Sequence, residues 1–232
     1  NPGNTQETPQ FAMAVWDYFR WTGDTAFLRT MYPVCREGVM EYLPGIWDGD
    51  RDGYPSGDAM VERHGMGALK LDSACYLYAA WRALAEMARA LNRPEAEEYE
   101  QLADDWLLRF ERDWWLPNVG LYADSLHSDY HPQLDGHWTQ IVPVQLGIAR
   151  ADRAQQVLEK IEREFTNQWG LVHTRDREDR VWTLPTGLLA LAGPDALLFW
   201  NPRQQGPKQN PDHFTTPAQD QLLSDCLREF NR

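Results

Sequence analysis

The feature that most constrains the fold is an alternation of helical segments joined in turn by very short and very long connections. Apolar periodicity and helix-favouring composition predict three helical pairs and the start of a fourth: 8–21 with 26–43, 70–91 with 95–115, 138–149 with 152–165, and 184–192. Short turns make antiparallel neighbours, so the long connections 47–72, 116–136 and 169–182 should meet at one end of the array. We expect a functional site at that end.

Local signals refine the helix ends. Thr8 is the expected N-cap of the first helix, with Pro9 at its first position, and Asp24 and Asp152 are expected to cap later helices. Pro33 should bend or restart the second helix rather than destroy it. Stacked helical hairpins predict an all-α protein, either an open solenoid or a closed α/α toroid. Residues 1–192 form the predicted helical domain, and 193–232 a Pro-rich segment with a short C-terminal helix.

Composition narrows the class of partner. The 35 acidic residues outnumber the 22 basic ones and give a net charge of -13, which disfavours nucleic acid as a partner. The 11 Trp residues suit stacking on sugar rings, although each single Trp is more often a core residue. No apolar run could span a membrane, so the expectation is a soluble protein of the bacterial cytoplasm or periplasm. Cys35, Cys75 and Cys226 are too few for a disulfide framework, and we expect small buried side chains.

The connection over 47–72 carries most of the candidate chemistry. Asp48, Asp50, Asp52 and Gly53 reproduce the opening of a calcium loop, in which alternate oxygens surround a hard cation and Gly permits the sharp turn. Ala59 stands where an EF-hand has its bidentate Glu, which rules out an EF-hand. The alternatives are a structural calcium site completed by other ligands and a solvated Asp-rich turn. The spacing of His127, His131 and His137 fits no zinc pattern.

Several segments together resemble the six-hairpin glycosidases, especially the glycogen-debranching or amylo-α-1,6-glucosidase-like branch and its processing-glucosidase relatives. They are FRWTGDTAFLRTMYP, WDGDRDGYP, KLDSACYLYAAWRALAEMA, YADSL, HWTQIVP and VWTLPTG, within residues 6–192. The resemblance implies an (α/α)6 toroid whose long connections form the mouth of the active site, and hydrolysis by two carboxylates with inversion. Three hairpins and part of a fourth stand where the family has six. This predicts an incomplete barrel, with the catalytic base outside the chain and doubtful activity for the fragment alone.

The resemblance also implies roles for single residues. Glu62, flanked by apolar residues and a Gly-rich turn, is the expected general acid, with Asp58 as the alternative. Both carboxylates could instead cap turns or pair with Arg63 and Lys70. Asp72 either contacts the sugar or simply caps the helix that it opens. The other candidate substrate-binding residues are Trp47, Tyr54, Arg63, Lys70, Asp124, His137, Trp138 and Trp182.

The functional hypothesis is a glucosidase or debranching-type glycoside hydrolase that acts on an oligosaccharide or polysaccharide. It requires no cofactor, apart from the possible structural calcium. One rival is a sugar epimerase or polysaccharide lyase on the same toroid, in which Tyr130 and His131 would handle the proton. Another is a non-catalytic carbohydrate-binding fragment.

Overall fold

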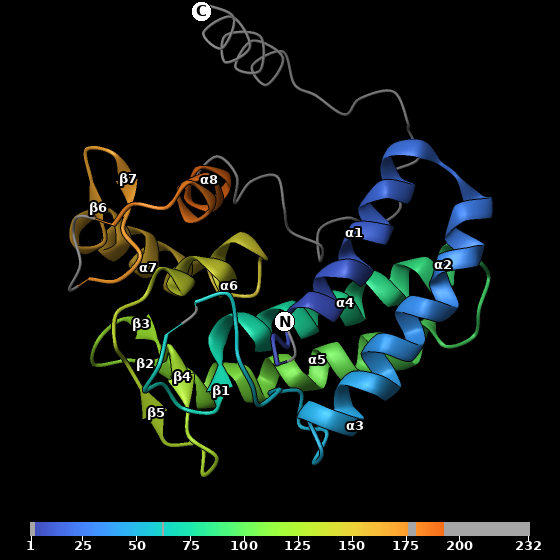
Figure 1. Cartoon of the computed structure of the whole chain (residues 1–232), viewed down its shortest axis with the longest axis horizontal. Coiled ribbons are helices and arrows are strands. Elements are labelled where there is room, and N and C mark those ends of the chain that lie inside the picture. Colours follow the sequence, from blue (N-terminus) through green and yellow to red (C-terminus); the bar gives the residue numbers. More distant parts are fainter. Residues whose placement is uncertain (1–2, 62, 176–179, 193–232) are drawn as a thin grey trace, which may run out of the picture. The chain divides into compact units, whose positions relative to one another are not determined.

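The computed structural model describes residues 3–61, 63–175 and 180–192, which are mainly helical (Figure 1). The helical elements are α1 (Glu7–Thr22), α2 (Thr25–Glu37), the π-helical turn η1 (Gly38–Tyr42), α3 (Leu43–Trp47), α4 (Leu71–Ala90), α5 (Ala96–Asp113), the 3-10 turn η2 (Trp138–Ile141), α6 (Val142–Gln145), α7 (Ala151–Glu164) and α8 (Thr183–Ala192). Each segment predicted to be helical within residues 1–192 contains one or more of these elements, although the first arm of the third hairpin is shorter than predicted.

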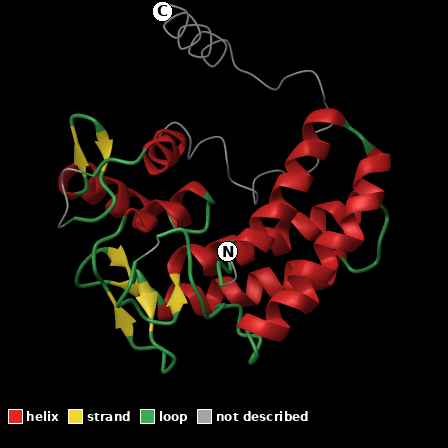
Figure 2. Cartoon of the chain, in the orientation of Figure 1, coloured by secondary structure: helices red, strands yellow, loops and turns green. Residues whose placement is uncertain are grey.

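Between its helices, the described part of the chain forms seven two-residue strands that were not predicted (Figure 2). They are β1 (Leu69–Lys70), β2 (Trp115–Leu116), β3 (Leu121–Tyr122), β4 (Ser125–Leu126), β5 (Pro132–Gln133), β6 (Thr166–Asn167) and β7 (Gly170–Leu171). The β1, β4 and β5 strands form one antiparallel sheet in the order β1-β4-β5, with Lys70 opposite Ser125 and Ser125 opposite Gln133. This sheet joins the first long connection to the second.

The first hairpin, α1 with α2, turns at Gly23, which is left-handed. The Asp24 carboxylate accepts the Phe27 N–H at 2.9 Å, which confirms the predicted cap. The predicted Thr8 cap is wrong, because the helix already begins at Glu7 and follows Gln6 without a side-chain cap. The preceding Thr5 is fixed to Asp58 of the first long connection, so the chain is directed into the helix before Thr8.

The second helix does not restart at Pro33. Helical structure continues through Pro33 to Glu37, passes into the π-helical turn and reaches Trp47 at the end of α3. A π-helix has i→i+5 hydrogen bonds, is rare, and occurs mostly as a single turn inside an α-helix, which is the position of η1 between α2 and α3. The first long connection therefore begins directly at the end of a helix.

The centre of the structure is α4, which is buried on nearly every side and contacts α1, α2, α5 and α6. Such an apolar circumference is expected only of a helix surrounded by others. Aromatic rings from α5 stack beside it: Trp106 lies 5.1 Å from Tyr78 and 4.6 Å from Phe110, measured between ring centroids. The α4 and α5 helices thus form the predicted second hairpin around the main core.

The third hairpin departs from prediction at its first arm. Instead of one helix over 138–149, the chain forms the short η2 and α6, which end by Gln145 before a left-handed glycine at Gly147. The Asp152 cap is also wrong, since Asp152 lies inside the first turn of α7 and Arg150 precedes the helix. The N-cap is the extended Arg150, two residues before the predicted cap.

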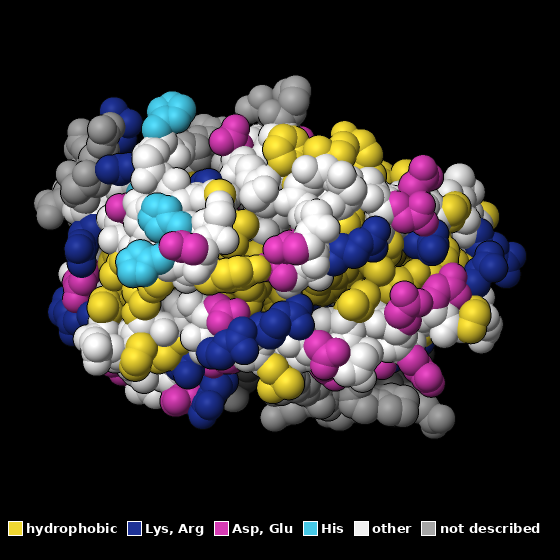
Figure 3. Space-filling model, turned by 90° about the horizontal axis from the view of Figure 1, so that it is seen from below, with side chains coloured by type: hydrophobic (Ala, Val, Ile, Leu, Met, Phe, Trp, Pro, Cys, Tyr) yellow, Lys and Arg dark blue, Asp and Glu magenta, His cyan; other side chains and the backbone are white. Residues whose placement is uncertain are grey.

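Cys35 and Cys75 are buried free thiols, as predicted. Cys226 and the whole segment 193–232 lie outside the described residues. On the face shown in Figure 3, acidic and basic side chains are interspersed around a band of hydrophobic side chains. Among the described helices, none combines the length and apolar character that crossing a bilayer requires.

Candidate functional site

The three long connections meet, as the alternation of short and long connections predicted. Gln133 in the second connection donates from Nε2 to the Gly65 carbonyl in the first at 2.9 Å. In the third connection, His173 Nε2 lies 3.0 Å from the Val61 carbonyl of the first. The His173 carbonyl accepts the Trp138 N–H at 3.2 Å. A site built from these connections would therefore draw on segments far apart in the sequence.

Of the two candidate acids, the structure describes Asp58 only. Asp58 is exposed, and its backbone is fixed at both polar groups: its N–H donates to the Gly3 carbonyl at 2.7 Å, and its own carbonyl accepts the Thr5 N–H at 3.1 Å. The Asp58 carboxylate is thus held on a fixed backbone at the surface. Glu62 lies outside the described residues. The role of each as an acid stays a prediction.

Asp72 lies fully buried in the first turn of α4. Its Oδ2 atom accepts the Met60 N–H at 3.0 Å, which ties the helix start to the segment that precedes Glu62. Burial raises the pKa of Asp72 to about 6, although the Met60 amide and the charge of Lys70 oppose that rise. The geometry supports the structural interpretation of Asp72, and contact with a sugar remains a prediction.

Lys70 holds the first connection in place. Its ammonium group donates to the carbonyls of Gly67 at 2.7 Å, Gly57 at 3.0 Å and Ala68 at 3.4 Å. The side chain is buried, and the loss of water around it lowers the pKa of Lys70. An ammonium has three donors, so these contacts use its hydrogen-bonding capacity and favour a structural role over the predicted contact with substrate.

Asp124 organises the second connection. Its two carboxylate oxygens accept the N–H groups of Asp135 and Gly136, both at 2.7 Å, and that of His137 at 3.2 Å. The Gln140 side chain adds a fourth bond at 2.9 Å. Burial raises the pKa of Asp124 to about 6 against the effect of these donors. A carboxylate this fully bonded holds backbone together, and its predicted role in substrate binding is untested.

The predicted aromatic and histidine candidates differ in how deeply they are buried. His137 and Trp138 are fully buried, which favours packing over direct stacking on a sugar. Trp182 is half-buried, and its ring centroid lies 4.3 Å from that of His173. His173 was not among the predicted site residues, because a single His within the third connection gave no pattern to find. Burial lowers its pKa, so the ring is expected to be neutral near pH 7.

The remaining candidates lie along the first connection. Trp47 is half-buried at its start, and Arg63 is half-buried beside Glu62. Tyr54 is buried under the connection, where its hydroxyl donates to Asp113 at 3.2 Å and its ring lies edge-on to Trp106 and Trp114. Trp47 and Arg63 thus have surface that a ligand could reach, whereas Tyr54 supports the fold.

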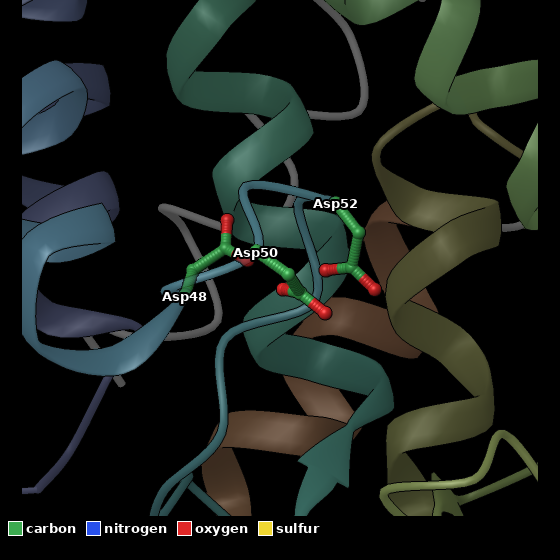
Figure 4. A group of neighbouring side chains, drawn as sticks. All are labelled: Asp48, Asp50 and Asp52. Atoms are coloured by element: carbon green, nitrogen blue, oxygen red, sulfur yellow. The ribbon is translucent and has the colours of Figure 1, made fainter.

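The predicted calcium-loop carboxylates lie together. Asp48, Asp50 and Asp52 each offer an oxygen, and these three atoms lie within 4.8 Å of one another (Figure 4). Asp48 is buried, Asp52 half-buried and Asp50 exposed. The turn can therefore offer three carboxylate oxygens to one cation.

Comparison with known proteins places this arrangement in a family. The family model described as the bacterial alpha-L-rhamnosidase six-hairpin glycosidase domain matches residues 3–174. No curated protein sequence matches the chain. The match supports the predicted superfamily and all-α toroid class, and it comes from a rhamnosidase branch rather than the predicted glycogen-debranching branch.

Two solved structures share the fold. A GH78 family rhamnosidase of Bacillus sp. GL1 superimposes with a TM-score of 0.55 at 21% identity, over 65% of this chain and 16% of that one. A rhamnosidase from Klebsiella oxytoca with rhamnose bound gives a TM-score of 0.56 at 15% identity, over 69% of this chain and 31% of that one. The chain thus spans less than a third of either enzyme's length. From residue 3 to residue 174 it belongs to the bacterial alpha-L-rhamnosidase six-hairpin glycosidase domain family.

Proposed function

We propose that the protein carrying this chain is a glycoside hydrolase that cleaves α-L-rhamnosides. The observation that carries the proposal is the family match over residues 3–174, in which the three long connections come together. The rhamnosidase names of both structural neighbours favour rhamnose as the sugar. The glucosidase or debranching specificity suggested by the sequence is the rival that the same assay tests.

In the proposed reaction, one carboxylic acid protonates the leaving oxygen while a second carboxylate activates water on the opposite face of the ring. The acid comes from the segment between Asp58 and Lys70, with Glu62 as the first candidate. The second carboxylate, the base, comes from outside the 232 residues. Inversion requires the two groups to stand about 6.5–9.5 Å apart.

The frame around Glu62 suits a positioned acid. On its N-terminal side, the Met60 N–H is bound by buried Asp72, and the Val61 carbonyl lies against buried His173. A few residues later, Gly67 donates its N–H to Ser125 Oγ at 2.9 Å and accepts from Lys70. Fixed backbone on both sides of the segment is the kind of support that a positioned catalytic group needs, because it lowers the entropic cost of reaching a productive geometry.

The test measures hydrolysis of aryl α-L-rhamnosides, aryl α-D-glucosides and malto-oligosaccharides by the full-length protein. We expect the rhamnoside to be hydrolysed with inversion at the anomeric carbon. NMR that identifies the first-formed anomer measures this outcome. A preference for the glucoside or for malto-oligosaccharides would overturn the sugar assignment. Binding of all these sugars without hydrolysis would overturn the enzymatic proposal.

Two variants assign the acid. Replacing Glu62 by Gln should lower kcat on a rhamnoside with a poor leaving group about 100-fold or more, and much less on a dinitrophenyl rhamnoside that needs no protonation. Asp58→Asn is measured in parallel as the alternative acid. Glu97→Gln, at an exposed position in the first turn of α5, is the matched control and should leave both rates unchanged. Equal losses of Glu62→Gln on both substrates would refute its role as the acid.

A further inference from the structure

The turn that opens the first long connection contains an unusual concentration of negative charge. Asp48, Asp50 and Asp52 each offer one oxygen, and these three atoms lie within 4.8 Å of one another. In the described part of the chain none of these carboxylates forms a salt bridge. Figure 4 shows the three side chains following one another around the turn. Like charges this close repel one another unless a proton or a cation intervenes.

Asp48 provides a second, independent observation. Only 3% of its surface is exposed. One carboxylate oxygen, Oδ2, accepts the Gly53 N–H at 3.0 Å, whereas Oδ1 is buried without a hydrogen-bond partner in the described structure. A buried acceptor without a donor is costly, and a hard cation would satisfy it.

The turn is held from several directions, so the carboxylates do not need to assemble on binding. Trp106 donates from Nε1 to the Gly53 carbonyl at 3.0 Å, and Arg109 donates to the Asp52 carbonyl at 2.9 Å. Asp52 Oδ1 also accepts the Tyr54 N–H at 2.7 Å. Preorganised ligands reduce the entropic cost of binding.

A residue from the second connection completes one side of the cluster. The Tyr130 hydroxyl donates to Asp52 Oδ2 at 2.6 Å and to Asp50 Oδ2 at 3.4 Å. Tyr130 has a φ of 64°, in the left-handed region that is uncommon for a residue with a side chain. The structure thus maintains a strained backbone where this hydroxyl meets the acidic turn.

We propose that Asp48, Asp50 and Asp52 form a binding site for one divalent cation, and that the cation is calcium. All three ligands are oxygen, and their alternate spacing followed by Gly53 reproduces the first half of a calcium loop. Calcium accepts 6–8 oxygen ligands at flexible geometry, so backbone carbonyls and water would supply the rest. No bidentate Glu stands at the twelfth position, so we expect a dissociation constant of about 10⁻⁵–10⁻³ M, weaker than that of tight EF-hand buffers.

The proposal is independent of the proposed hydrolysis. Its effect would be structural, because a cation at this turn would join the end of α3 to the second connection through the carboxylates that Tyr130 also contacts. The first connection runs on from this turn to the candidate acids. Calcium would therefore stabilise the start of the segment that carries them.

The first experiment follows terbium luminescence in protein treated with a chelator. Terbium occupies calcium sites, and aromatic rings such as Tyr54 and Tyr130 lie close enough to the turn to sensitise its emission. We expect emission on excitation of the protein, and its displacement by calcium at a concentration about tenfold or more below that needed with magnesium. Equal displacement by the two ions would refute the assignment to calcium. Absence of protein-sensitised emission would refute the site.

The second experiment uses variants and an independent readout. Asp50 is exposed, so Asp50→Asn should fold and should weaken calcium binding about tenfold or more in isothermal titration. Asp129→Asn, an exposed position in the neighbouring connection, is the matched control and should bind like the wild type. At one calcium concentration that saturates the wild type, the Tm of the wild type and of Asp129→Asn should rise by several degrees, and that of Asp50→Asn by about half as much or less. An equal rise in all three proteins would refute the site.

Discussion

Gly53 lies where the acidic turn rests on the core, and it offers a sharp test of the described packing. Its φ is +82°, and a Cβ atom added there would lie 2.6 Å from Trp106 Cδ1 and 2.6 Å from Trp81 Cη2. Both rings are buried. Trp106 also donates its indole N–H to the Gly53 carbonyl, so the ring cannot turn away without losing that bond. A methyl group at this position therefore has no free space.

The expected cost of Gly53→Ala has two parts. A left-handed backbone costs a residue with a Cβ about 1–2 kcal/mol. Overpacking against the two indoles adds about 1–3 kcal/mol. The free energy of unfolding should therefore fall by about 2–5 kcal/mol. Urea denaturation followed by circular dichroism measures this difference, provided that the slope of the transition is unchanged.

Gly65→Ala provides the matched control within the same connection. Gly65 has nearly the same φ, +84°, but an added Cβ would meet no atom within 4 Å. It should show the backbone cost alone, about 1–2 kcal/mol. The difference between the two variants isolates the contact with Trp81 and Trp106. Equal destabilisation by the two substitutions would refute the close approach of the turn to these rings.

Two further substitutions test the buried charges beside the candidate site. Lys70→Met removes the donor to the Gly57 and Gly67 carbonyls and should lower the free energy of unfolding by about 2–4 kcal/mol. Lys160→Met, at a half-buried position of α7 where Lys160 pairs with Glu164, should cost under about 1 kcal/mol. Equal costs in urea denaturation would contradict the structural role of Lys70. Asp72 has a pKa of about 6 when folded, above the value of about 4 for an unfolded Asp, so its contribution to stability is complete below pH 4 and is lost as the pH rises through 6. The stability of wild type relative to Asp72→Asn should therefore fall by about 2 kcal/mol between pH 4 and pH 7, and a constant difference would show that Asp72 titrates normally.

The helices were predictable because their signals are local. The α4 segment has helix-forming residues without Gly or Pro, and the structure places the helix at Leu71–Ala90 against a prediction of 70–91. The Asp24 cap is also a local interaction, between neighbouring residues of one turn. The prediction of a cap at Thr8 was wrong because contacts of Thr5 with the distant Asp58 fix where the helix begins. Sequence patterns therefore predicted the features that depend on interactions between residues close together in the sequence.

The short strands and the burial of the polar candidates depend on contacts between distant segments. Lys70 pairs with Ser125 across the β1 and β4 strands, and two-residue strands leave too little alternation to detect. Nothing local distinguishes Asp124, which is enclosed by backbone donors, from Asp58, which is exposed. The meeting of the long connections was nevertheless predictable, because it follows from the alternation of turn lengths rather than from side-chain detail.

The buried charges explain how a helical scaffold can keep such long connections ordered. A helix satisfies its backbone internally, whereas an irregular segment needs other partners for its N–H and C=O groups. Lys70 supplies donors to carbonyls of the first connection, and Asp124 supplies acceptors to amides of the second. At the opening of the first connection the acidic turn of Asp48 keeps a buried oxygen without a donor. A buried carboxylate oxygen needs a partner as much as a buried backbone group does, and a cation bound at Asp48 would supply the partner that the described protein groups do not.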